Sequence, residues 1–542
     1  MSTAALTAAR HKRDSHSWRN TTVAVEAFAK ARTRPNDVAF FLESEPDATY
    51  GSIADEARRL ISALLELGLG KGDVVSFQIP NWREGAVIDI AAAALGLVVN
   101  PIVPIYRDAE LRFILGDAKT RLMFIPQSFR SIDYLEMLLS LRPQLPDLEY
   151  LVTVRGDSDS PDVLAFETLL QRDPADETSL PPVDPDSVKC RLYTSGTTGF
   201  PKAVLHSHNT LTRIMDNSAE HAGVSADDVM IMPSPITHIT GYASGINFPF
   251  IGRGRTALME RWDANRCIDL IKRVNGTMSV GATPFLRELL DAAEQRGECL
   301  PSMRQFSCGG AAVPPNLVLR AYEVLKNCRT TRVYGSTEAP IITLGWREDA
   351  QLAATTDGQP YGYEVRILDD NGADTPDGVD GEIAARGPGM FLGYADEEQN
   401  ADAHTNDGFF LTGDIGRRTP EGAILITDRK KDIIIRGGEN LSAKEIEDCL
   451  DSHPLIKESA VVAMPHERLG EGVCAFLIMN SDDDSLSTAE VASYANDIGM
   501  ARQKFPEHII KVDDLPRTPS GKVKKDTFFF LMIRRPPRST RL

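Results

Sequence analysis

The sequence predicts an α/β protein: a large N-terminal domain of layered α/β subdomains plus a β subdomain, followed by a small α+β C-terminal domain. Three observations support this prediction. Short apolar runs alternate with helical patterns through most of the first 430 residues, which favours a largely parallel sheet. Residues 359–428 have short strands between Gly, Asp, Asn and Pro turns, which is typical of an antiparallel β subdomain. A new helical pattern begins after residues 429–432, and 542 residues are enough for several domain-sized units.

The first helix with a clear period is expected in residues 50–70. Six apolar side chains recur there at helical spacing before a closing glycine: Ile53, Ala57, Leu60, Ile61, Leu64 and Leu65. Strands are expected at 73–79 and 121–126. The most apolar long window, 86–105, is interrupted by an acid, a glycine and two prolines, so it is too short for a membrane span. It is predicted to be a helix followed by a buried strand.

Residues 172–187 are rich in Pro and Asp and are expected to form a surface linker. Further on, after the charged cluster "RKKD", Ser442 and Glu445 have the spacing of a capping box, in which each side chain bonds the other residue's free N–H at a helix start. This restart predicts an N-terminal domain of residues 1–430 and a small C-terminal domain of residues 431–527.

The last stretch, residues 528–542, differs from the rest of the chain. It begins with three phenylalanines and an apolar run and ends with four arginines and no acidic residue. The string resembles a translated sequencing adapter, so we expect it to be a non-native tail.

The composition limits the classes of partner. The formal net charge is −18, so the chain as a whole is a poor ligand for polyanions, and nucleic acid is not expected as a partner. The 7 cysteines are scattered without a C-x-x-C pair, which is typical of buried thiols in a reducing compartment. The first residues lack the apolar core of a secretory signal. A cytoplasmic protein without an integral membrane segment is therefore expected, with a mitochondrial presequence as the weaker alternative.

The segment Tyr193–Lys202, "YTSGTTGFPK", concentrates glycines and hydroxyls beside a lysine. It is not a P-loop, because that motif places its lysine directly after the second glycine and opens a helix there. Here strand-like runs lie on both sides, and the next helix cap is expected at Asn209. Composition alone leaves a plain turn as the alternative. Successive backbone N–H groups around glycines form an anion-binding nest, so the sequence favours a phosphate loop of another kind.

This decamer matches the signature of the adenylate-forming superfamily, which includes acyl-CoA synthetases, nonribosomal-peptide adenylation domains and luciferases. Further segments resemble the other motifs of that family in the same order: "VYGSTE" (Val333–Glu338), "LTGDIG" (Leu411–Gly416), "DRKKDIIIRGGENLSAKEIE" (Asp428–Glu447) and "PRTPSGKVKK" (Pro516–Lys525). The resemblance covers nearly the whole chain up to about Thr527. It implies an enzyme that activates a carboxylic acid with ATP and passes the acyl group to a thiol.

The resemblance assigns most candidate residues to ATP. The phosphate loop would hold the β- and γ-phosphates through Thr194, Ser195, Gly196, Thr197, Thr198 and Gly199, with Lys202 assisting. The other nucleotide contacts would come from an adenine slot, an α-phosphate site and a ribose site: Gly309, Gly310, Ala311, Tyr334, Gly335, Ser336, Thr337, Asp414 and Arg429. Glu338 would hold Mg²⁺, a hard cation that takes oxygen ligands and bridges phosphates. Outside this motif, such a glutamate would be interpreted as a solvent-exposed acid.

Lys522, in the terminal motif, is the expected catalytic residue of adenylation, together with Thr337, Glu338 and Lys202. Its ammonium would reach the α-phosphate and carboxylate oxygens as a mobile point charge. By resemblance, the small domain is mobile and rotates between the two half-reactions. That rotation would bring Gly437 and Gly438 to a pantetheine tunnel, with Lys431 at the hinge.

The segment Pro233–Phe250 resembles the acyl-pocket segment of the family, with His238, Gly241 and Tyr242 as lining residues. His238 could instead be a packed core histidine. The pair His206 and His208 lacks an apparent third ligand, so a metal site is not expected there. No aspartate of the amino-acid-binding kind follows this segment, which disfavours amino-acid activation.

Residues 100–115 most resemble ligases that couple cyclohexanecarboxylate, medium-chain or aromatic acids to coenzyme A. The expected function is an ATP-dependent carboxylic acid–CoA ligase that works through an acyl-adenylate, with ATP, Mg²⁺ and coenzyme A. The alternative is an acyl- or aryl-AMP ligase that loads a phosphopantetheinyl carrier protein; a non-catalytic nucleotide or acyl binder is a distant second. The expected partners are small molecules. The oligomeric state is left open, with a homodimer as one candidate.

Overall fold

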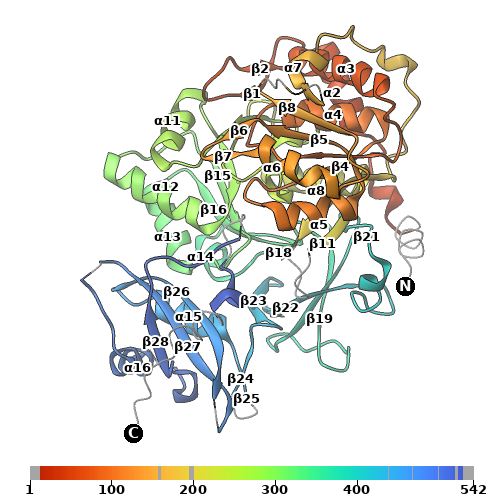
Figure 1. The fold of residues 1–542 in the computed structure, drawn as a ribbon. Helices are drawn as coiled ribbons and strands as arrows, with labels where there is room; N and C mark the ends of the chain where they lie inside the picture. Colours follow the sequence, from red (N-terminus) through yellow and green to blue (C-terminus); the bar gives the residue numbers. More distant parts are fainter. Residues whose placement is uncertain are drawn as a thin grey trace.

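The structure is a computed structural model that describes residues 13–156, 160, 162–194, 201–436, 439–466, 468–481, 483–498, 500–518 and 523–528 (Figure 1). Most of these residues lie in the upper body of Figure 1, and the strands from β24 (Ile434–Arg436) onward form a smaller body below it.

Two large sheets organise the upper body. In the first, the order is β18-β17-β16-β15-β14-β12-β13-β1-β2, and neighbours from β16 to β1 run parallel. Its strands are β1 (Val38–Phe41), β2 (Ala48–Thr49), β12 (Val229–Met232), β13 (Arg255–Leu258), β14 (Met278–Gly281), β15 (Gln305–Gly309), β16 (Arg329–Tyr334), β17 (Thr343–Leu344) and β18 (Gln359–Pro360).

The second sheet has the order β21-β11-β10-β4-β3-β5-β8-β9 and is parallel from β10 to β9. Its strands are β3 (Val74–Phe77), β4 (Val98–Pro101), β5 (Thr120–Pro126), β8 (Tyr150–Val154), β9 (Val163–Ala165), β10 (Val188–Thr194), β11 (Lys202–Ser207) and β21 (Gly393–Tyr394). Both sheets are largely parallel, which confirms the prediction from the alternating pattern.

Helices lie against both sheets (Figure 1). They are α2 (Val23–Thr33), α3 (Tyr50–Glu66), α4 (Glu84–Leu95), α5 (Asp108–Ala118), α6 (Tyr134–Leu141), α7 (Phe166–Leu169), α8 (His208–Ala222), α11 (Ala264–Val274), α12 (Thr283–Arg296), α13 (Pro315–Val324) and α14 (Ala350–Thr355). The predicted helix followed by a buried strand in residues 86–105 is confirmed as α4 and β4.

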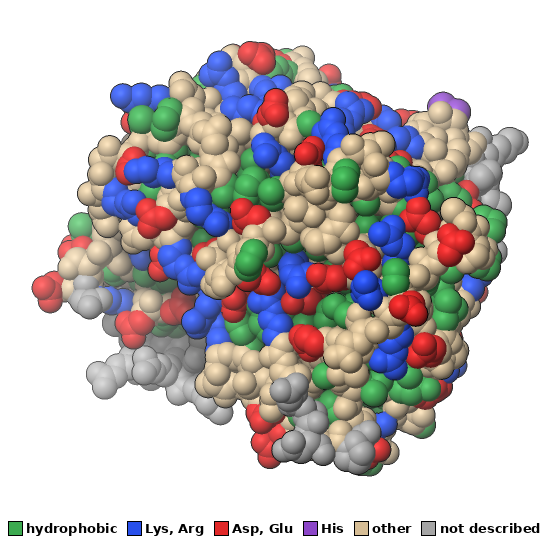
Figure 2. All heavy atoms as spheres, turned by 90° about the horizontal axis from the view of Figure 1, so that it is seen from above, with side chains coloured by type: hydrophobic (Ala, Val, Ile, Leu, Met, Phe, Trp, Pro, Cys, Tyr) green, Lys and Arg blue, Asp and Glu red, His purple; other side chains and the backbone are tan. Residues whose placement is uncertain are grey.

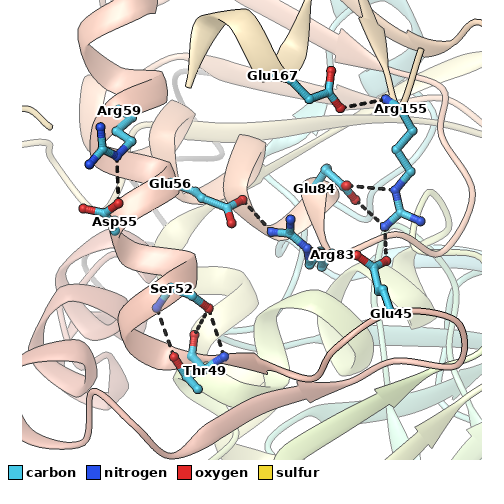
Figure 3. Close-up of polar contacts among 10 residues, drawn as sticks. All are labelled: Glu45, Thr49, Ser52, Asp55, Glu56, Arg59, Arg83, Glu84, Arg155 and Glu167. Carbon is cyan, nitrogen blue, oxygen red and sulfur yellow. Dashed lines mark hydrogen bonds and ion pairs between the residues drawn. The ribbon is translucent and has the colours of Figure 1, made fainter. Parts of the chain in front are cut away.

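The first predicted helix is confirmed as α3. A reciprocal capping box opens it, with Ser52 N donating to Thr49 Oγ1 over 3.1 Å and Thr49 N donating to Ser52 Oγ over 3.0 Å (Figure 3). Five of its six predicted apolar side chains are buried, but Leu65 is 48% exposed because it lies one helical step beyond the buried face. Gly68 follows with a left-handed φ of 73°, as a helix end requires.

Two smaller sheets complete the fold. The antiparallel sheet β19 (Glu364–Leu368)-β20 (Gly381–Arg386)-β22 (Phe410–Arg418)-β23 (Ile424–Arg429) confirms the predicted β subdomain. The lower body contains β24, β25 (Glu439–Leu441), β26 (Ile456–His466), β27 (Gly470–Met479) and β28 (His508–Lys511) with helices α15 (Ala443–Asp451) and α16 (Thr488–Asp497). The fold class is therefore as predicted; the exact domain boundary at 430/431 stays a prediction.

The cap of α8 differs from the sequence prediction. Ser207, not Asn209, begins the helix, because Thr210 N donates to Ser207 Oγ and Ser207 N donates to Thr210 Oγ1. The amide of Asn209 instead donates to Asp186 over 2.7 Å. A serine two residues upstream with a threonine at the reciprocal position is the better capping pair.

The predicted capping box of α15 is only half formed. Ser442 Oγ accepts from Glu445 N over 3.0 Å, as expected. The Glu445 carboxylate, however, pairs with the Lys504 ammonium at 2.6 Å and does not return to the Ser442 backbone. A tertiary ion pair has replaced the local contact.

The structure also describes the cysteines, the charged surface and the start of the predicted tail. All seven cysteines are free thiols, and all but Cys299 are buried. In the described part of the chain, no helix combines the length and the apolar character that crossing a membrane requires. Figure 2 shows Lys and Arg side chains interspersed with Asp and Glu over one face. Phe528, the first residue of the predicted tail, packs against Phe476, with 4.3 Å between the two ring centroids. Residues 529–542 lie outside the described residues.

Candidate active site

The phosphate loop connects two antiparallel strands. β10 and β11 pair with Thr194 opposite Lys202, so the chain leaves and re-enters the same sheet at one point. This strand–loop–strand arrangement differs from a P-loop, which opens a helix. The loop residues Ser195, Gly196, Thr197, Thr198 and Gly199 lie outside the described residues, so their phosphate contacts stay a prediction.

The second nucleotide motif forms a tight turn after β16. A Cβ on Gly335 would lie 2.3 Å from the Ile341 nitrogen, so the turn closes only with glycine at this position. Ser336 N donates to Ala339 O over 3.1 Å, and Ala339 N donates to Ser336 Oγ over 3.2 Å. The turn is therefore rigid before any ligand binds.

His206, on β11 of the second sheet, bonds the same turn. Its Nε2 lies 2.7 Å from the Thr337 carbonyl oxygen, and because a carbonyl only accepts, this nitrogen carries the proton. Its Nδ1 lies 3.1 Å from Thr210 Oγ1. Among the described residues, no group of three His, Cys, Asp or Glu side chains could hold a metal ion. One member of the H-x-H pair is thus explained by backbone positioning.

Glu338 is the half-buried carboxylate of this motif. Its Oε1 accepts a hydrogen bond from the Tyr394 hydroxyl over 2.9 Å, and its backbone oxygen accepts from Phe391 N over 2.8 Å. Within the described ranges, no Lys or Arg forms an ion pair with it. A half-exposed carboxylate without a cation partner among the described residues, in a motif that the resemblance assigns to ATP, fits an oxygen ligand for Mg²⁺.

Asp414, in the segment Leu411–Gly416, contacts Tyr334 of the segment Val333–Glu338. It is buried, with Oδ2 accepting from the Tyr334 hydroxyl over 2.8 Å and Oδ1 lying 3.0 Å from Arg429 Nε. β22 and β23 place Asp414 opposite Arg429 in register. Burial, and after it the Asp414 carboxylate, raises the pKa of the Tyr334 phenol well above its usual range, so the hydroxyl stays protonated and donates.

The predicted adenine slot follows β15 beside this group. Gly309 faces Val333 in register, and a Cβ there would lie 2.2 Å from the Val333 oxygen. Gly310 has a left-handed φ of 83°, and both Gly310 and Ala311 are exposed. Small residues at an open strand end leave room for a flat base against the backbone, as the resemblance implies.

The predicted acyl-pocket segment follows β12. His238 begins the short helix α9 (Ile239–Gly241), with its Nδ1 accepting from Thr240 N over 3.4 Å. A Cβ on Gly241 would lie 2.1 Å from the Pro235 oxygen, so this glycine lets two backbones approach. Tyr242 opens the π-helix η4 (Tyr242–Asn247), a rare form that often occurs at functional sites.

Tyr242 is fully buried, and its hydroxyl joins an ion pair. Lys189 Nζ lies 2.7 Å from Asp89 Oδ1, 2.9 Å from Asp89 Oδ2 and 2.7 Å from the Tyr242 oxygen. The Tyr242 hydroxyl in turn donates to Asp89. This group joins β10, which leads into the phosphate loop, to the acyl-pocket segment.

A second connection comes from the loop after β3. The Asn81 amide donates to the Ser234 oxygen, and its Oδ1 accepts from Ile236 N, both over 2.9 Å. A charge cluster holds this loop: Arg155 bonds Glu84 and Glu45, as Figure 3 shows, and its guanidinium lies 4.4 Å from the Trp82 ring centroid. Asn81 therefore positions the acyl-pocket segment from the other sheet.

Hydrogen bonds connect the two bodies of the structure. Asp428, at the end of β23, accepts from Ala443 N at the start of α15 over 2.9 Å. Arg287 of α12 donates to the Lys457 oxygen over 2.6 Å. Lys431, three residues after Asp428, is exposed, while Gly437, Gly438 and Lys522 lie outside the described residues. Their roles stay predictions.

The sequence did not indicate Tyr394 or Asn81 as residues of this site, nor the positioning role of His206. The signal for His206 was present, since a polar residue alternates into the buried face of a strand. Tyr394 and Asn81 act across long sequence separations, and only the β11–β21 pairing and the Asn81–Ile236 hydrogen bond reveal them.

Comparison with known proteins defines the class. The ATP-bound MatB of Rhodopseudomonas palustris superposes with a TM-score of 0.83 at 26% identity, covering 95% of this chain and 99% of that one. Fold and site together are those of an adenylate-forming enzyme, an AMP-forming acid–thiol ligase. The chain belongs to the AMP-binding enzyme family, whose model matches residues 27–395, with the family's C-terminal domain matching residues 445–522.

Two relatives are similar to this chain over most of its length. A medium-chain fatty-acid–CoA ligase of Escherichia coli (strain K12) is 35% identical over 501 residues, covering 91% of this chain and 88% of that protein. A 2,3-dihydroxybenzoate–AMP ligase of Bacillus subtilis (strain 168) is 29% identical over 481 residues, covering 88% and 87% respectively. The predicted superfamily is thus confirmed.

Proposed function

We propose that this protein joins an alicyclic, medium-chain or aromatic carboxylic acid to coenzyme A through an acyl-adenylate. The observation that carries the proposal is the Tyr334–Asp414–Arg429 group beside Glu338, which provides a ribose acceptor and a metal ligand at one strand end. The similarity to a medium-chain fatty-acid–CoA ligase supports the acid class.

In the first half-reaction, a carboxylate oxygen attacks the α-phosphorus of ATP, and the bond from that phosphorus to the bridging oxygen breaks. Pyrophosphate leaves, and acyl-AMP remains. Two anions must meet, so the site needs donors that offset their repulsion. The loop from Thr194 to Gly199 would hold the β- and γ-phosphates with Lys202, and Thr337 and Lys522 would bond the α-phosphate.

Mg²⁺, when bound, would supply positive charge that offsets the negative charge of the phosphates. Glu338 would hold it, because its carboxylate keeps one oxygen beyond the Tyr394 hydrogen bond. The buried Asp414 would accept from the ribose hydroxyls, and Gly309, Gly310 and Ala311 would receive adenine.

In the second half-reaction, the thiol sulfur attacks the acyl carbon, the acyl–phosphate bond breaks, AMP leaves, and the thiol proton goes to solvent. We propose that the domain from residue 431 rotates between the two steps, which withdraws Lys522 and brings Gly437 and Gly438 to the pantetheine. Lys431 would be the hinge.

The second candidate is a ligase that loads a phosphopantetheinyl carrier protein. The similarity to a 2,3-dihydroxybenzoate–AMP ligase favours it. The cytoplasmic location and a homodimer likewise stay predictions.

The test is acid-dependent exchange of labelled pyrophosphate into ATP across a panel of alicyclic, medium-chain, aromatic and amino acids, followed by thioester formation with coenzyme A or with a holo carrier protein. We expect exchange with one of the first three classes and transfer to coenzyme A. Exchange with amino acids alone, or transfer to the carrier protein alone, would contradict the proposal.

A further inference from the structure

Tyr394 lies between two groups that the proposed function assigns to ATP. β21 pairs antiparallel with β11, with Val204 opposite Tyr394 (Figure 1). On β11, Lys202 lies two residues before Val204, so both side chains are on the same face. The Lys202 ammonium is 4.9 Å from the Tyr394 ring centroid, within the range of a cation–π contact.

The hydroxyl of the same ring bonds Glu338 Oε1 over 2.9 Å. The phenol donates and the carboxylate oxygen accepts, so this is a charge-assisted hydrogen bond. One ring thus touches a cation with its face and an anion with its hydroxyl.

The backbone around Tyr394 is fixed on both sides. The fully buried Asn400 accepts from Tyr394 N over 2.9 Å and donates to Tyr394 O over 3.0 Å. Phe391 packs 5.1 Å from the Tyr394 ring centroid, and its backbone N–H bonds the Glu338 carbonyl. The segment 391–394 therefore holds both the backbone and the side chain of Glu338.

We propose that Tyr394 is a positioning residue that sets the Glu338 carboxylate for Mg²⁺ and the Lys202 ammonium for the β- and γ-phosphates. This inference rests on the proposed function. Without the hydroxyl, the carboxylate would rotate among several positions, and Mg²⁺ would bind at a cost in side-chain entropy. Without the ring, Lys202 would also lose its place.

The test measures the Kd for ATP by equilibrium dialysis, once with Mg²⁺ and once with EDTA, and the Mg²⁺ concentration for half-maximal pyrophosphate exchange. For Tyr394→Phe we expect about a 10-fold loss of the Mg²⁺-dependent gain in ATP affinity, in line with one charge-assisted hydrogen bond. The Kd in EDTA should stay within about twofold, because the ring remains under Lys202. Tyr394→Leu should also weaken ATP binding in EDTA.

Two further variants separate positioning from general damage. Tyr134→Phe removes a hydroxyl that bonds the Pro104 oxygen over 2.8 Å, not Glu338, and should leave the Mg²⁺ response unchanged. Glu338→Gln should abolish most of the Mg²⁺ response, and adding Tyr394→Phe to it should change nothing more, because the two groups act together.

An unchanged Mg²⁺ response in a folded Tyr394→Phe protein, or full additivity with Glu338→Gln, would overturn the inference. Absence of acid-dependent exchange in the unmodified protein would instead contradict the proposed function. The ATP-binding measurements do not need the acid, so they test Tyr394 in either case.

Discussion

The Tyr334 hydroxyl donates to Asp414 over 2.8 Å, joining residues 80 positions apart in the sequence. Tyr334 ends a strand of the large parallel sheet, whereas Asp414 lies in the antiparallel β subdomain. The bond therefore fixes the subdomain against the sheet at the point where the ribose would lie. With Arg429 on its other oxygen, Asp414 is oriented before the nucleotide arrives.

Tyr334→Phe should weaken ATP binding, because Asp414 loses the donor that holds Oδ2. We expect a rise in the KM for ATP of about 10-fold, the size of one hydrogen bond to a charged group, and little change in the KM for the acid. Tyr322→Phe is the matched control, since the Tyr322 hydroxyl is buried and has no hydrogen-bond partner among the described residues. Equal effects of the two variants would contradict the role of Tyr334.

Gly241→Ala should destabilise the acyl-pocket segment. The added Cβ would lie 2.1 Å from the Pro235 oxygen, well under the 3.0 Å that Cβ contacts keep, so the backbone must shift. We expect a loss of about 2 kcal/mol or more in unfolding free energy and altered acid selectivity. Gly116→Ala, in α5, should be neutral or slightly stabilising, because the described part of the structure places no neighbouring atom within 4 Å of the added Cβ. Thermal unfolding and the acid panel check both, and a stable, equally selective Gly241→Ala enzyme would contradict the argument.

Lys189→Met should strongly reduce stability, since it leaves Asp89 charged and buried without its cation. Removing one partner of a buried ion pair costs about 3–5 kcal/mol. The surface pair Lys444–Asp448, at 2.6 Å along α15, provides the comparison, because Lys444→Ala should cost only about 0.5 kcal/mol. Urea unfolding measures both. A small effect at Lys189 would mean that solvent reaches the pair.

Asp451 should make the small domain less stable as the pH rises. Burial raises the pKa of Asp451 to about 7, and Glu447 adds to the rise while a hydrogen bond from Ser459 opposes it. The unfolded chain loses this proton near its ordinary value of 3.8, so folding becomes less favourable between about pH 4 and 7. Asp451→Asn should therefore raise the unfolding free energy by about 1–3 kcal/mol at pH 8 and by little at pH 4.

Thermal unfolding across this pH range is the measurement for Asp451. Asp448→Asn, an exposed carboxylate on the same helix, is the control and should show no such pH-dependent gain. A gain at Asp451→Asn that is equal at both pH values would argue against a buried proton.

The sequence predicts the strands, the main helices and the motif order well, because hydrophobic period and turn residues act locally. The stretch around Gly335 is an example: its glycine is required by a contact only six residues away. The motifs also predict Asp414 and Arg429 for one site, and the structure brings the two side chains together, since they lie opposite each other on neighbouring strands.

Long-range polar pairs could not be predicted in this way. Lys189 occupies a polar position of an alternating strand, yet it is 1% exposed because Asp89, 100 residues earlier, neutralises it. Glu445 likewise leaves its local capping position for Lys504. These ion pairs depend on which charges the fold brings together, and spacing along the chain does not predict them.

In the proposed function, a lysine of the small domain acts in adenylation but takes no part in thioester formation. The direct test is Lys522→Ala, assayed separately for acyl-AMP formation from acid and ATP and for acyl-CoA formation from supplied acyl-AMP. We expect a loss of about 100-fold or more in the first reaction and a change within about threefold in the second. Equal loss of both reactions, or no loss of the first, would contradict it.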